Sequence, residues 1–174
     1  MNWKELLEKE AESSYKGAEV LFGLVDDSML DWKPQTGGNW MTTGQLLRHV
    51  ADACGESFRG FTTGVWGPAE GPDPASLPIE ETLPSAETLP SVESVGEAGA
   101  LLAEDRKLVF DLLASIGDEE LGGKEAPAPW DPTPMLLGHR LLQMIDHLKI
   151  HKAQLYYYLK LQDKPVHTGH LWVM

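Results

Sequence analysis

Three histidines are the side chains of this 174-residue sequence best suited to metal chemistry: His49, and the pair His147 and His151. Two residues four positions apart in an α-helix lie about 40° from each other around its axis, so both imidazoles of the pair can point at one atom. A third imidazole from another helix would complete the three-nitrogen face with which proteins hold a catalytic divalent ion while leaving one coordination position open. Such an arrangement would suit a three-histidine metal site.

An isolated pair of this spacing is easily obtained by chance, and histidines beside an apolar face are more often core residues than ligands. The residues beside these histidines nevertheless exclude other known metal motifs. Leu148 stands where a zincin carries its general-base glutamate. Met144 stands three residues before His147, where a ferritin-like di-iron site needs a glutamate. The sequence also contains neither a Gly-x-Ser-x-Gly nucleophile elbow nor a phosphate-cradling glycine loop.

Apolar residues recur at helical spacing in four segments, which we expect to form four amphipathic helices. Thr42 followed by Gln45 is a capping box that opens the second helix. Ser94 followed by Glu97 is another such signal, so the third helix is expected to begin at Ser94 or at the earlier Ser91. The expected spans are 3–25, 42–61, 91 or 94 to 116, and 133–161.

The connections between these helices complete the fold prediction. Thr133 and Pro134 are expected to begin the fourth helix, because an N-capping threonine before a first-turn proline is a common start. Residues 67–90 are rich in Pro, Glu, Ser and Gly and form either a crossover connection, which we favour, or a lid over a site. We therefore expect an all-α fold, a four-helix bundle with a long crossover loop between helices 2 and 3, as a single domain over residues 1–174.

His49 and His147 occupy matching positions on their expected helices. His49 lies at the edge of the inward stripe of the second helix, His147 flanks the stripe of the fourth, and His151 lies within it. All three are therefore expected to face the interior. His139 is turned away from the stripe and is interpreted as a surface residue, and the two histidines of the tail 166–174 are left out of the site.

Two acidic residues and one cysteine have open roles. Asp105 falls on the inward face of the third helix, where it is either an acceptor behind a metal-bound histidine or, as we favour, a cap or water-bound structural group. Glu56 is the best candidate for the general base of a hydrolase, although a solvated or ion-paired glutamate is the commoner case. Cys54 has no cysteine partner in this sequence and is expected to be buried. No residue is assigned a catalytic role.

The charge balance restricts the classes of partner. Lys and Arg total 14 and Asp and Glu total 27, which gives a formal charge of −13. Such a chain, without a basic stripe, is a poor ligand for nucleic acid or for an anionic membrane. No apolar run reaches the length of a membrane span, and no basic-then-apolar leader follows Met1. We therefore expect a cytoplasmic protein with a small-molecule substrate.

Three segments of the sequence together form a recognisable pattern: residues 32–34 (Trp-Lys-Pro), residues 40–49 and residues 147–155. In the last of them, Ala153 stands where glycine is usual. Together these segments resemble the DinB-like, or YfiT-like, family of metal-dependent proteins, and the resemblance covers about residues 3–165.

The resemblance implies a bundle that binds a divalent ion, commonly nickel or zinc, through His49, His147 and His151, and that often forms a homodimer. Some members are thiol-dependent S-transferases or isomerases that use low-molecular-weight thiols, others are described as hydrolases, and many have no known activity. We therefore expect a metal-dependent S-transferase that activates a small thiol. A metal-dependent hydrolase and a non-catalytic, metal-containing stress-response binding protein are the alternatives.

Overall fold

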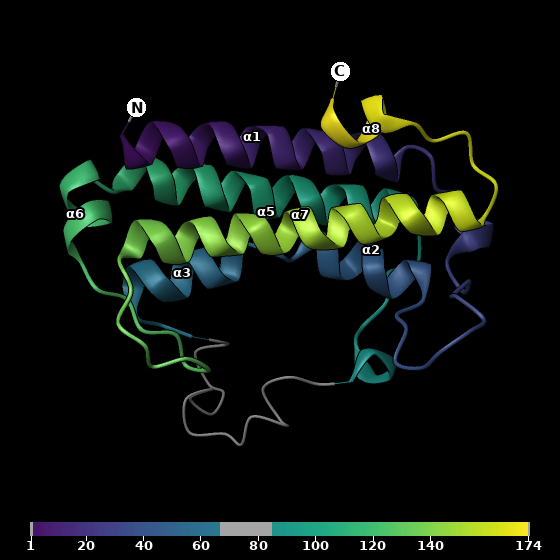
Figure 1. Cartoon of the computed structure of the whole chain (residues 1–174), viewed down its shortest axis with the longest axis horizontal. Coiled ribbons are helices and arrows are strands. Elements are labelled where there is room, and N and C mark those ends of the chain that lie inside the picture. Colours follow the sequence, from purple (N-terminus) through teal and green to yellow (C-terminus); the bar gives the residue numbers. More distant parts are fainter. Residues whose placement is uncertain (1, 67–84, 174) are drawn as a thin grey trace.

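The computed structural model describes residues 2–66 and 85–173 (Figure 1). Within these ranges the chain is all-helical, and its β-type pairing is limited to two isolated bridges in the segment 125–136. The expected long connection over residues 67–90 falls mostly on residues 67–84, which lie outside the described part. None of the described helices is both long enough and apolar enough to cross a membrane.

Long helices set the architecture. Helix α1 (Trp3–Phe22) packs against both α5 (Val95–Ser115) and α7 (Leu137–Leu161). On the other side of α5 and α7, the shorter helices α2 (Thr43–Ala51) and α3 (Gly55–Thr63) lie one after the other along both long helices (Figure 1). Fully buried side chains from all these helices form one core, for example those of Leu7, Leu21, Leu46, Phe58, Leu102, Leu141 and Leu155.

Side-chain caps begin two of the helices where the sequence predicts them. The backbone amide of Gln45 donates to Thr42 Oγ1 at 3.2 Å, and Gln45 Oε1 accepts from the amide of Thr42 at 2.8 Å, which confirms the capping box of α2. At α5, the amide of Glu97 donates to Ser94 Oγ at 3.0 Å. The third helix therefore begins after Ser94 and not after Ser91.

The expected second helix is broken into two. In a continuous helix the amide of Gly55 would donate to the carbonyl of Ala51, four residues earlier. In the structure it donates at 2.7 Å to Oδ1 of Asp105, which belongs to α5. Helix α2 therefore ends at Ala51, and α3 begins at Gly55 after a non-helical Cys54 with φ −121°.

The prediction that the fourth helix begins at Thr133 and Pro134 is wrong, because α7 begins at Leu137. The segment before α7 instead folds back on itself, and the amide of Ala126 donates to the carbonyl of Met135 at 2.8 Å. The amide of Leu137 likewise donates to Lys124 O at 2.8 Å. These pairings hold the last residues before α7 in an extended conformation.

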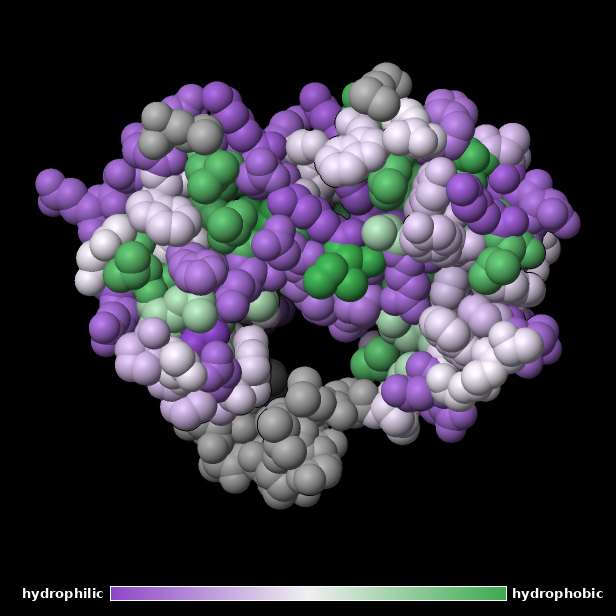
Figure 2. Space-filling model, in the orientation of Figure 1, coloured by the Kyte–Doolittle hydropathy of each residue, from purple (hydrophilic) through white to green (hydrophobic). Residues whose placement is uncertain are grey.

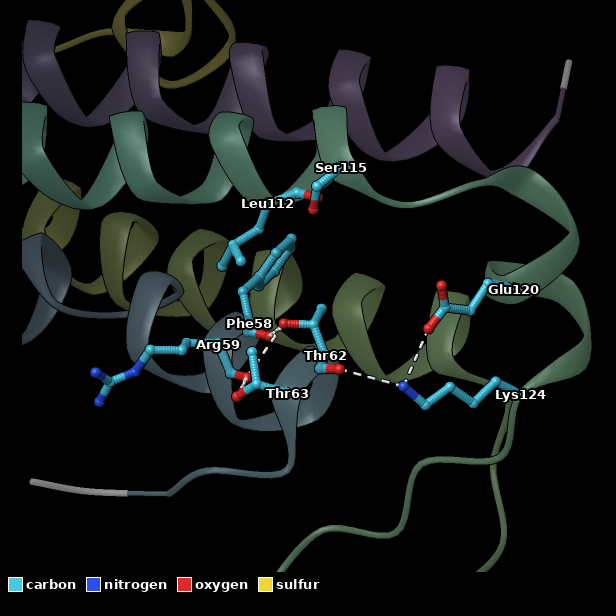
Figure 3. Close-up of polar contacts among 8 residues, drawn as sticks. All are labelled: Phe58, Arg59, Thr62, Thr63, Leu112, Ser115, Glu120 and Lys124. Carbon is cyan, nitrogen blue, oxygen red and sulfur yellow. Dashed lines mark hydrogen bonds and ion pairs between the residues drawn. The ribbon is translucent and has the colours of Figure 1, made fainter. Parts of the chain in front are cut away.

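Short helices that the sequence patterns did not predict pack against the long ones. Helix α6 (Asp118–Gly123) follows α5, and Lys124 at its end donates from Nζ to Glu120 Oε1 at 3.0 Å and to the carbonyl of Thr62 in α3 at 3.2 Å (Figure 3). Helix α8 (Thr168–Trp172) packs on α1 near the end of the chain. Two 3₁₀ turns, Asp27–Met29 (η1) and Ala86–Thr88 (η3), complete the described elements.

The helix break gives a matched pair of glycine substitutions. A Cβ at Gly55 would lie 2.5 Å from Asp105 Oδ1 and 3.0 Å from the side chain of Leu108, whereas a Cβ at Gly99 on α5 would meet nothing within 4 Å. We expect Gly55→Ala to lower the free energy of unfolding by about 1–3 kcal/mol through overpacking. Gly99→Ala should raise it by about 0.5–1 kcal/mol, because alanine favours the helix. Urea denaturation measures both, and equal effects would contradict this account of the break.

Candidate metal centre

The three predicted histidines meet at one point between two helices. His49 comes from α2, and His147 and His151 come from α7. Each offers one ring nitrogen to a group in which all three nitrogens lie within 4.8 Å of one another. Nε2 of His49 and Nε2 of His147 are 3.1 Å apart, and the three rings stand nearly perpendicular to one another in pairs. The structure therefore brings the three predicted side chains together.

The outer nitrogen of His147 faces a carbonyl that the helix break releases. The first hydrogen bond of α3 runs from the amide of Phe58 to the carbonyl of Cys54, so the carbonyl of Ala53 precedes that ladder. It lies 3.4 Å from His147 Nδ1. Because a carbonyl only accepts, it favours the tautomer in which Nδ1 carries the proton and donates. That tautomer leaves a lone pair on Nε2, directed at the meeting point.

The outer nitrogen of His151 is oriented by a chain of polar side chains. Tyr158 donates its hydroxyl proton to the carbonyl of Met41 at 3.0 Å, so its oxygen can accept from Gln154 Nε2 at 3.3 Å. This bond turns Gln154 Oε1 toward His151 Nδ1, 3.1 Å away. His151 therefore donates from Nδ1 and keeps the lone pair of Nε2 free for a ligand role. Gln154, three residues after His151, was not predicted as a site residue, although helix spacing places the two side chains side by side.

Burial keeps the three rings neutral. Removal from water lowers the pKa of His147 and of His151, and burial together with the two neighbouring histidines lowers the pKa of His49 to about 4. At neutral pH each ring is therefore uncharged and keeps one nitrogen lone pair with which it can bind a metal ion. Two nitrogens bound at about 2.0–2.1 Å to one tetrahedral ion lie roughly 3.3 Å apart, close to the observed 3.1 Å. The donor set thus fits a divalent ion that accepts imidazole ligands.

The three histidines lie in the wall of a pocket of about 620 Å³. Figure 2 shows the molecular surface hollowed on this side, below the middle of α7 in the view. Apart from the histidines, the described residues that line the pocket are Asn39, Trp40, Met41, Ser57, Ala86, Leu89, Trp130, Met144 and Gln154. Among these described residues there is no Asp, Glu, Lys or Arg. Nothing in the sequence pattern signalled Trp130, because its position depends on the folded-back segment before α7.

Other predicted residues lie away from the histidines. His139 is exposed on α7, as expected, and His167 and His170 stack on each other in the tail at a ring-centroid distance of 3.9 Å. Glu56, the candidate base, is exposed and forms an ion pair with Arg59 of the same helix, and it does not line the pocket. Its observed position therefore agrees with the ion-paired interpretation.

Asp105 is the cap rather than a direct acceptor for a histidine. Its Oδ1 accepts from the amide of Gly55, and its Oδ2 accepts from the hydroxyl of Tyr15 at 2.6 Å. Cys54, beside this pair, is fully buried as expected, and its thiol donates to the carbonyl of Met144 at 3.2 Å. Burial raises the pKa of Asp105 to about 6 against the lowering effect of its hydrogen bonds.

Comparison with known proteins gives the family. A family model described as the DinB superfamily matches residues 11–155, which include all three histidines. The chain belongs to the DinB superfamily. No curated protein and no solved structure matches it. The expected resemblance is thus confirmed, together with the three-histidine cluster on which it was based.

The raised pKa of Asp105 makes a prediction about stability. The folded protein binds the carboxyl proton more tightly than the unfolded chain does, so this group stabilises the fold less as the pH rises from about 4 to about 6. Buried histidines with lowered pKa values act in the opposite direction over this range, but they are shared by wild type and variant. We therefore expect the stability of Asp105→Asn relative to wild type to rise by about 2–3 kcal/mol between pH 4 and pH 6.5.

Urea denaturation of chelator-treated protein across this pH range measures the difference. Glu104→Gln, at an exposed position of the same helix, is the matched control and should show no such trend. A pH-independent difference between Asp105→Asn and wild type would show that Asp105 keeps an ordinary pKa in the folded protein.

Proposed function

We propose that His49, His147 and His151 bind a divalent ion, nickel or zinc, and that this DinB superfamily protein is a thiol-dependent S-transferase. The observation that carries the proposal is the convergence of three imidazoles in the wall of a pocket whose described lining contains no carboxylate. Bound there, the ion would lower the pKa of a small thiol and hold it as the thiolate. Such a reaction needs no protein base, since the thiol proton passes to water.

The chain's own residues would orient and shield the reactants. Ala53 and Gln154 hold the two histidines of α7 in the ligand tautomer. The apolar wall excludes water, so an uncharged electrophile can approach the thiolate. The sulfur then forms a bond to the electrophilic carbon, and the bond from that carbon to the leaving group breaks with its electron pair going to the leaving group.

Hydrolysis has less support in this pocket. A metal-dependent hydrolase would be helped by a general base beside the nucleophilic water. The candidate Glu56 is engaged with Arg59 outside the pocket. A binding protein without turnover has no specific observation in its favour, and it becomes one outcome of the experiments below.

The remaining structural predictions belong with this proposal. We propose that α1, the α2–α3 pair, α5 and α7 are the four helices of one bundle, and that the chain forms a single domain. The homodimer implied by the resemblance stays a prediction. Its support is an exposed apolar row on one face of α7, made by Ile150, Tyr157 and Leu161.

Metal binding is the first test. Each of His49→Ala, His147→Ala and His151→Ala is expected to weaken binding of zinc and of nickel by at least about 100-fold, because two imidazoles cannot replace the three-nitrogen face. His139→Ala is the matched control, since His139 lies on α7 but is exposed. Elemental analysis and titration with each metal measure occupancy. A folded protein that binds neither ion, or a histidine variant that keeps wild-type affinity, would overturn the proposed site.

Thiol chemistry is the second test. Wild-type protein loaded with metal is expected to accelerate the reaction of cysteine or glutathione with 4-nitrobenzyl chloride, and both a chelator and His147→Ala should abolish the acceleration. His139→Ala should leave it unchanged. Thiol-independent release of nitrophenol from 4-nitrophenyl acetate would support the hydrolase instead. Metal binding with neither activity, across a panel of small thiols, would support the protein without turnover.

A further inference from the structure

We infer that the pocket over the three histidines binds an uncharged, mostly apolar organic molecule and holds it against Trp130 and Trp40. The identification of this molecule as the electrophile rests on the proposed function. The binding preference itself rests on the pocket alone.

Several polar groups of the pocket already have hydrogen-bond partners within the protein. Asn39 Oδ1 accepts from the amide of Ala86 at 2.9 Å. Gln154 spans His151 and Tyr158. A charged ligand group would therefore give up its hydration without an opposite charge among the described lining residues, which costs free energy. Cysteine and glutathione carry ammonium and carboxylate groups, so the pocket suits the electrophile better than the body of the thiol.

Two partly exposed indoles, from separate segments of the chain, belong to the apolar wall. Trp40 is 36% exposed and Trp130 is 39% exposed, although both are large apolar side chains. Trp40 precedes α2, and its Nε1 donates to the carbonyl of Thr36 at 2.7 Å. Trp130 lies in the connection between α6 and α7, edge-on to Trp66 at a centroid distance of 5.4 Å. The pocket volume of about 620 Å³ is typical of sites for small organic ligands.

A buried arginine anchors the segment that carries Trp130. Arg140 is 2% exposed and donates from Nε to the carbonyl of Ala126 at 3.0 Å and from Nη1 to Asp131 Oδ2 at 3.0 Å. Its Nη2 donates to the carbonyl of Thr133 at 2.7 Å. Because one guanidinium donates several hydrogen bonds to the connection between α6 and α7, it holds that connection in a fixed conformation. The indole is therefore positioned before a ligand arrives, which reduces the entropy lost on binding.

The size of the indole contribution follows from known aromatic contacts. An aromatic pair contributes about 0.5–1.5 kcal/mol beyond the burial of its area, which corresponds to roughly 2- to 12-fold in affinity. Removal of Trp130 should therefore produce a measurable loss rather than complete loss, because Trp40 and the methionines remain.

Three isosteric probes test the charge preference: 4-nitrobenzyl alcohol, 4-nitrobenzoate and 4-nitrobenzylammonium. Calorimetric titration at pH 7.5 is carried out on the full chain, both loaded with zinc and after treatment with chelator. Without metal, we expect the alcohol to bind at least about tenfold more tightly than either charged probe. Trp130→Ala should weaken binding of the alcohol about fivefold, and Trp130→Phe should restore most of it.

Trp172→Ala is the matched control, because Trp172 is 64% exposed on α8 and does not line this pocket. It should leave the affinity unchanged. Equal or tighter binding of a charged probe to the chelator-treated protein would overturn the inference, and so would binding of the alcohol that Trp130→Ala leaves intact. Failure of the proposed S-transferase would appear separately, as absent thiol chemistry in a metal-loaded protein that still prefers the neutral probe.

Discussion

One hydrogen bond, from the amide of Gly55 to the carboxylate of Asp105, shapes the region around the histidines. By capturing an amide that a continuous helix would use internally, Asp105 divides one expected helix into α2 and α3. The division leaves the Ala53 carbonyl outside the helical ladder, where it faces His147. A buried carboxylate on one helix thereby acts through the backbone on the tautomer of an imidazole on another.

The convergence of the histidines could be predicted from the sequence because it depends on local helical periodicity. His147 and His151 are one helical turn apart. His49 lies at the edge of the apolar stripe of its helix, as His147 does on the other helix. The caps at Thr42 and Ser94 are equally local, and both form as expected. Features of this kind need only a few neighbouring residues to specify them.

The helix break and the start of α7 depend on partners that are distant in sequence or on competing backbone pairings. Asp105 is 50 residues from Gly55, so no pattern near Gly55 signals the break. Thr133 and Pro134 have the local signature of a helix start, yet Arg140 and the pairing of Ala126 with Met135 hold that segment extended. The same competition places Trp130 in the pocket, which explains why the sequence patterns missed it. Tertiary contacts overrode local preference at each of these positions.

The origin of the three ligands on two distant stretches of chain has a thermodynamic consequence. His49 and His147 are 98 residues apart in sequence, so an ion held by both would act as a removable cross-link closing a long loop. In the folded chain the two histidines are already held together, so binding the ion costs no further loop-closure entropy. In the unfolded chain, an ion bound by both histidines would close this loop at a cost in entropy. Occupancy and folding are therefore linked, and the melting temperature of this protein would depend on the free metal concentration of its surroundings.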